Sequence, residues 1–76
     1  MKDFKGNLKK ANQLVRLIGI NNVWNVDAGE YNILLMCYKE MGTEEKLIQE
    51  GFVQPADEND NLFTKDNIRV RITLNK

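Results

Sequence analysis

Hydrophobic and polar residues alternate most regularly near the carboxyl end of the chain. From Ile68 to Leu74 every second residue is apolar, and Arg69 and Arg71 are among the polar residues between them. Such alternation is typical of a strand with one buried and one exposed face. Residues 62–65 precede it, and Asp66-Asn67 between the two runs tolerates the left-handed backbone of a tight turn. The pattern therefore predicts a β-hairpin from which both arginines point outward on one face.

Two other segments carry helical spacing. The first begins at Asn7, which we expect to be the N-cap, and ends at Gly19. Its apolar face comprises Leu8, Ala11, Leu14, Val15 and Ile18. The second covers residues 43–50, with Thr43 as the capping residue and Gly51 as the stop.

The segment 21–42 admits two interpretations. In the first, Asp27 caps a helix over residues 28–41 that ends at Gly42. In the second, Val23–Val26 and Tyr31–Tyr38 are the strands of a hairpin, and Gly29 is the left-handed residue of its turn. Leucine, methionine and lysine favour the helix, and a strand here would be apolar on both faces, which a small open sheet can hardly cover. We therefore predict the helix and keep the hairpin as the alternative.

These elements predict one small α+β domain spanning residues 1–76. Its order is three short helices followed by a C-terminal β-hairpin, with a short strand at Phe52-Val53, as in winged-helix proteins. The alternative for the middle segment gives an α-β-β-α-β-β two-layer sandwich instead. Both arrangements predict the same core: Leu8, Leu14, Val15, Ile18, Trp24, Leu34, Leu35, Tyr38, Leu47, Ile48, Phe52, Val70 and Ile72.

Composition narrows the chemistry that the chain can perform. It contains no histidine and no serine, and Cys37 is its single cysteine. Ser-His and Cys-His nucleophilic sites are therefore excluded, and a tetrahedral zinc site lacks ligands. We expect a protein that is not an enzyme and that has no cofactor, no metal and no membrane-spanning segment. The lone cysteine indicates a reducing, cytoplasmic setting.

Charge is unevenly distributed although the formal net charge is zero. Both ends of the chain are basic, whereas the middle is acidic, which is a feature of electrostatically steered binding. The candidate basic binding face consists of Lys9, Arg16, Arg69 and Arg71. The acidic alternative consists of Glu44, Glu45, Glu50, Asp57, Glu58 and Asp60. The competing interpretation is that the arginines pair with Glu44, Glu45 or Glu50 within the domain.

Three classes of function remain, and the missing catalytic residues disfavour a small enzyme. A winged-helix-like nucleic-acid-binding protein would use the basic residues of the first helix and of the hairpin. However, its recognition helix would begin with Glu44 and Glu45, which repel phosphates. We therefore predict a non-enzymatic module that binds another protein. A short single-domain chain suits an accessory protein of a phage or mobile element, and the asparagine and lysine content is typical of AT-rich genomes. An inhibitor of a nucleic-acid enzyme would be one instance, because acidic surfaces can occupy phosphate-binding channels.

Overall fold

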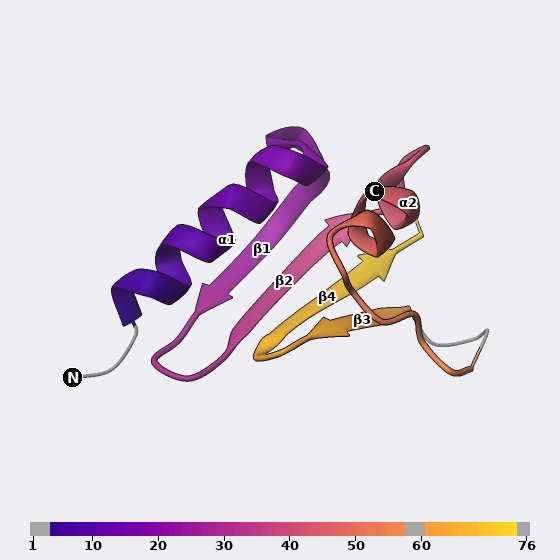
Figure 1. Ribbon diagram of the computed structural model, residues 1–76. Helices are drawn as coiled ribbons and strands as arrows, with labels where there is room; N and C mark the ends of the chain where they lie inside the picture. The colour runs from indigo at the N-terminus through magenta and orange to yellow at the C-terminus, as the bar shows by residue number, and fades with distance from the viewer. Residues whose placement is uncertain (1–3, 58–60, 75–76) are drawn as a thin grey trace.

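The computed structural model describes residues 4–57 and 61–74, which form a mixed α+β domain (Figure 1). The described residues form two α-helices and a four-stranded sheet. In chain order the elements are α1 (Phe4–Ile18), a 3₁₀ turn (Ile20–Asn22), β1 (Val23–Ala28), β2 (Ile33–Tyr38), α2 (Thr43–Gln49), β3 (Leu62–Lys65) and β4 (Ile68–Thr73). This order is the α-β-β-α-β-β alternative, so the predicted three-helix, winged-helix-like order is wrong.

The difference arises in the middle segment, where the predicted helix over 28–41 is replaced by the hairpin of β1 and β2. Ile33, Leu35 and Cys37 are fully buried on one face of β2, whereas Leu34 and its neighbours on the other face are half-buried. Burial of these side chains at the centre of a sheet outweighs the small helix preference of leucine and methionine. The objection that a small sheet cannot cover an apolar strand on both sides fails, because the second face is left partly exposed.

The sheet places the two hairpins side by side in the order β1-β2-β4-β3. Both hairpins are antiparallel, whereas the central strands β2 and β4 run parallel. Across the centre, Leu35 lies opposite Val26 on β1 and opposite Val70 on β4. Because paired residues share a face, the alternation predicted for β4 fixes which face of each neighbouring strand is buried.

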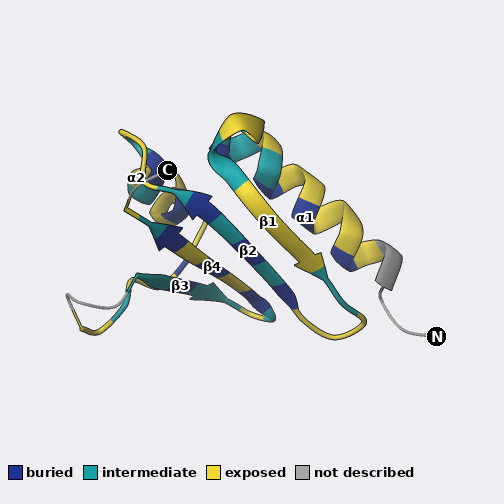
Figure 2. Ribbon diagram, turned by 180° about the vertical axis from the view of Figure 1, so that it is seen from behind, coloured by how far each residue is buried: buried dark blue, intermediate teal, exposed yellow. Residues whose placement is uncertain are grey.

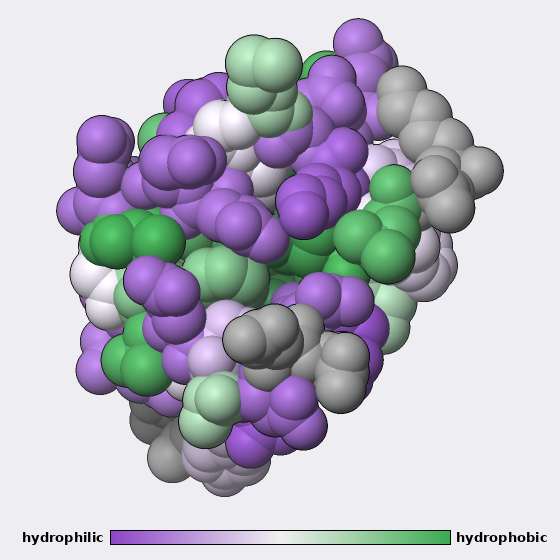
Figure 3. Space-filling view, turned by 90° about the vertical axis from the view of Figure 1, so that its right-hand side faces the viewer, coloured by the Kyte–Doolittle hydropathy of each residue, from purple (hydrophilic) through white to green (hydrophobic). Residues whose placement is uncertain are grey.

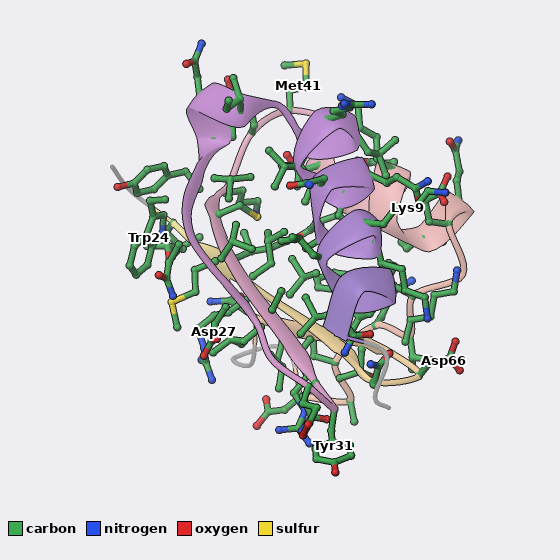
Figure 4. All side chains as sticks on the ribbon, turned by 90° about the vertical axis from the view of Figure 1, so that its left-hand side faces the viewer. Lys9, Trp24, Asp27, Tyr31, Met41 and Asp66 are labelled. Carbon is green, nitrogen blue, oxygen red and sulfur yellow. The ribbon has the colours of Figure 1, made fainter. Side chains whose placement is uncertain are left out.

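Both helices lie on the same side of the sheet, and the core forms beneath them (Figures 1 and 4). The buried hydrophobic residues are Ala11, Leu14, Ile18, Ile33, Leu35, Cys37, Leu47, Phe52, Phe63, Ile68, Val70 and Ile72. Seen from behind (Figure 2), β2 and β4 carry most of the buried positions of the sheet. The core prediction was wrong for Leu8, Trp24 and Ile48, which are exposed. It was also wrong for Leu34 and Tyr38, which are half-buried on the other face of β2.

The polar residue Asn7 explains the error at Leu8. Asn7 is not an N-cap, because α1 begins at Phe4, and its side chain is only 2% exposed. The helix is rotated so that Asn7, Ala11, Leu14 and Ile18 are its buried residues, which leaves Leu8 on the exposed side. The predicted stop at Gly19 is confirmed by its left-handed φ of 111°.

The second helix is confirmed, but its predicted cap is not. Gly42 occupies the N-cap position with φ 87°, no side chain caps the helix, and Thr43 is buried instead. Gly51 ends the helix as predicted, with φ 99° and a hydrogen bond from its N–H to the carbonyl of Ile48. Phe52 N–H then donates to the carbonyl of Leu47, which turns the chain toward the core.

The two hairpin turns differ from each other. Asp66 adopts φ 52°, as predicted for the turn between β3 and β4. Gly29 is not in the left-handed region, so the turn predicted between β1 and β2 is wrong in type. The short strand predicted at Phe52-Val53 is a single bridge between Val53 and Thr64.

Candidate functional site

The candidate site is the face of the sheet that the helices do not cover, which we call the open face. The strand register assigns to it Asn25 and Asp27 of β1, Leu34, Met36 and Tyr38 of β2, Leu62 and Thr64 of β3, and Arg69, Arg71 and Thr73 of β4; Trp24 joins them through its ring contact with Tyr38. Figure 4 shows Trp24 and Asp27 on the side of the sheet opposite α1. These residues alternate along the strands with the core residues, and successive side chains of a strand point to opposite faces of the sheet. They therefore lie on the face opposite the core.

Arg69 and Arg71 lie at the centre of the open face. Both are exposed and alternate with buried residues of β4, which confirms that they point outward on one side. Leu34 and Thr64 flank Arg69, whereas Met36 and Leu62 flank Arg71. In residues 4–57 and 61–74 neither guanidinium forms an ion pair with the glutamates of α2 or with Glu50. The interpretation that they are neutralised by Glu44, Glu45 or Glu50 is therefore wrong.

An aromatic pair occupies one corner of the open face. The ring centroids of Trp24 and Tyr38 are 6.1 Å apart, and the ring planes are tilted by 32°. Trp24 lies where the register between β1 and β2 shifts, between Val23 and Asn25, which is a β-bulge. Bulges redirect side chains, and this Trp is 47% exposed. The sequence predicted a buried tryptophan because nothing in its local pattern marks the bulge.

The remaining cations of the predicted basic face lie elsewhere. Lys9 and Arg16 are exposed on α1, where they border a shallow hollow with Asn12 and Gln13. Since α1 covers the opposite side of the sheet, the structure separates this pair from Arg69 and Arg71 (Figure 4). The four predicted cations therefore form two pairs on opposite sides of the molecule.

The acidic candidates do not form one compact cluster in the described residues. Glu44 lies 3.9 Å from Lys39 in a half-exposed ion pair, which contributes little at such a site. Glu45 and Asp57 are exposed. The carbonyl of Glu50 accepts a hydrogen bond of 2.6 Å from Lys65 Nζ. Glu58 and Asp60 lie outside the described residues.

A second hollow, of about 470 Å³, lies between α1 and the turn that joins β3 to β4. Leu14, Phe52 and Ile68 contribute apolar surface to it. Its charged residues are Lys10, Glu50, Lys65 and Asp66, so neither sign of charge is preferred. Viewed from one side of the molecule (Figure 3), apolar surface shows in a hollow between hydrophilic side chains.

The chain's single cysteine, Cys37, does not face these surfaces. Cys37 is a buried free thiol, and desolvation by burial raises its pKa to about 11, so it stays protonated near neutral pH. Within residues 4–57 and 61–74 no cluster of three or more Cys, Asp or Glu side chains is arranged to hold a metal ion. No helix in those residues combines the length and the apolar character needed to cross a bilayer.

Comparison with other proteins gives no relative. No family model, curated protein or solved structure matches the chain. The functional assignment therefore depends on the geometry and chemistry of the open face.

Proposed function

We propose that this protein is a small non-enzymatic module that binds another protein through the open face. The observation that carries the proposal is a four-stranded sheet with helices on one side, which leaves Leu34, Met36 and Leu62 partly exposed beside the two arginines. Aromatic residues, methionine and arginine are enriched at the centres of protein interfaces. Trp24, an exposed tryptophan, is the residue type most often found as a binding hot spot.

The aliphatic centre of this face favours a protein over a nucleic acid. Single-stranded nucleic acids bind sheets mainly by stacking bases on aromatic rings and by neutralising phosphates. Here the central positions beside Arg69 and Arg71 are Leu34, Met36 and Leu62, which offer no ring. The chain also has a formal net charge of zero. The aromatic pair of Trp24 and Tyr38 keeps single-strand binding as the second candidate.

An accessory or inhibitor role is the more specific form of the proposal. A compact chain of 76 residues can block a partner by occupying its binding surface, without any chemistry of its own. The asparagine and lysine content motivates a phage or mobile element as the source. The free thiol of Cys37 suits action in a reducing compartment such as the cytoplasm.

Site-specific photo-crosslinking tests the proposed function. A benzophenone side chain is introduced at Thr64, on the open face, and in a second protein at Asn12, which is exposed on α1. After irradiation in extract of the source cells, we expect an adduct from Thr64 that protease destroys, that nuclease leaves intact and that excess unmodified protein prevents. An adduct from Asn12 alone, or a nuclease-sensitive adduct from Thr64, would contradict the proposal.

A further inference from the structure

Both outer strands of the sheet are poorly suited to pairing with another strand. On the outside of β3, Val53 N–H donates to the carbonyl of Thr64 at 2.8 Å, and Thr64 N–H donates back at 3.3 Å. On the other side, β1 carries the bulge at Trp24 and the exposed carboxylate of Asp27. Bulges and edge charges are devices that prevent strand addition. A partner of this domain is therefore expected to contact the face of the sheet and not its edges.

The open face requires negative charge from whatever covers it. Arg69 and Arg71 are two residues apart on one strand, so they are separated by roughly 7 Å. Among the described residues of the four strands, the carboxylate on this face is that of Asp27, which lies two strands from Arg69 with Leu34 between them, so the two backbones are about 10 Å apart. A partner that covers both guanidiniums without supplying counter-charges would leave them desolvated and unpaired, which is strongly unfavourable.

The size of the face limits what can cover it. Strands of six residues are roughly 20 Å long, and four strands span about 14 Å between the outermost axes. A single helix, about 10 Å in diameter, or a pair of strands fills such an area. Leu34, Met36 and Leu62 surround the arginines with aliphatic surface, so the covering segment needs apolar side chains next to its carboxylates.

We propose that the partner docks an acidic amphipathic segment face-on against the open face. Its apolar side chains contact Leu34, Met36 and Leu62, and its carboxylates pair with Arg69 and Arg71. This inference rests on the proposed function and specifies the chemistry of the protein partner. Guanidinium–carboxylate pairs that exclude water in this way set the orientation and the specificity of an interface.

Titration with three synthetic peptides tests the inference. The peptides have 14 residues with leucines at helical spacing, and they differ only in carrying glutamate, glutamine or lysine at the remaining positions. With the full ¹⁵N-labelled chain, we expect the glutamate peptide to shift the amide signals of Leu34, Met36, Leu62, Arg69 and Arg71. We expect the glutamine and lysine peptides to bind at least about tenfold more weakly.

Matched variants locate the contact. The double variant Arg69→Glu, Arg71→Glu should bind the glutamate peptide at least about tenfold more weakly. The control variant Lys9→Glu, Arg16→Glu makes the same change of charge on α1 and should bind the peptide as tightly as the unchanged protein. Val26→Lys adds a charge to the exposed edge strand β1, and it should leave peptide binding unchanged because the partner is expected not to pair with that edge. Equal binding of the lysine peptide, or shifts confined to α1 or to β1, would overturn the inference.

The photo-crosslinking experiment separates this inference from the proposed function. If the Arg69→Glu, Arg71→Glu pair leaves the protease-sensitive Thr64 adduct undiminished, the acidic partner segment is refuted and protein binding stands. If the Thr64 adduct is nuclease-sensitive, both proposals are refuted. Both proposals are supported if the Thr64 adduct with a protein disappears in the Arg69→Glu, Arg71→Glu variant and persists in the Lys9→Glu, Arg16→Glu variant.

Discussion

Replacing Leu35 with alanine should lower the free energy of unfolding by about 2–5 kcal/mol. Leu35 is fully buried at the middle of β2, with Val26 and Val70 opposite it on the two neighbouring strands. Truncation removes apolar contacts and leaves a cavity that surrounding strands cannot easily close. Since small domains are stable by only about 5–15 kcal/mol, this loss is a large share of the total. Urea unfolding followed by circular dichroism measures it.

The matched control is Leu34→Ala, one residue away on the open face. Leu34 is half-buried and has no helix above it, so we expect a loss of about 1 kcal/mol or less. A larger loss of unfolding free energy in Leu35→Ala than in Leu34→Ala would show that only one side of β2 is covered. Equal losses at the two positions would contradict a one-sided sheet.

Replacing Asn7 with alanine should have the second largest effect, a loss of about 1–3 kcal/mol. Its Nδ2 donates to the carbonyls of Gly29 at 2.9 Å and Glu30 at 3.2 Å, and its Oδ1 accepts from Asn67 Nδ2 at 3.1 Å. Asn67 Nδ2 also donates to the carbonyl of Tyr31 at 2.9 Å. The buried amide thus ties α1 to the turns of both hairpins, and its removal leaves polar groups without a protein partner.

Asn12→Ala provides the comparison for Asn7, because Asn12 is exposed on the same helix. Its loss should remain within about 0.5 kcal/mol. Thermal and urea unfolding of the two variants are compared under the same conditions. A loss at Asn7 no larger than that at Asn12 would show that the hydrogen bonds between α1 and the turns do not stabilise the domain.

The parts of the fold that could be predicted are those whose signals are local. Alternation from Ile68 onward identified β4, and Asp66 identified its turn, because both depend on residues adjacent in the sequence. Gly19 and Gly51 identified two helix ends for the same reason. The segment 33–38 was assigned incorrectly because its conformation depends on pairing with β4, more than thirty residues away. Local propensity contains no information about that pairing.

The same distinction applies to the candidate site. Alternation alone placed Arg69 and Arg71 on one exposed face. Trp24 was missed because it lies on the edge strand β1, on the face that no helix covers, and a single sequence shows neither the strand order nor the register shift beside it. The separation of Lys9 and Arg16 from the open face follows from the packing of α1 on the other side of the sheet, which charge counting cannot reveal.

The central claim is that β2 is a strand in the middle of the sheet, because the open face exists only if this is so. Backbone chemical shifts and nuclear Overhauser effects of the labelled chain test it most directly. We expect extended shifts from Ile33 to Tyr38, together with cross-strand contacts between Leu35 and Val70. Helical shifts over residues 28–41 without those contacts would contradict it, because they would restore a third helix and remove the open face.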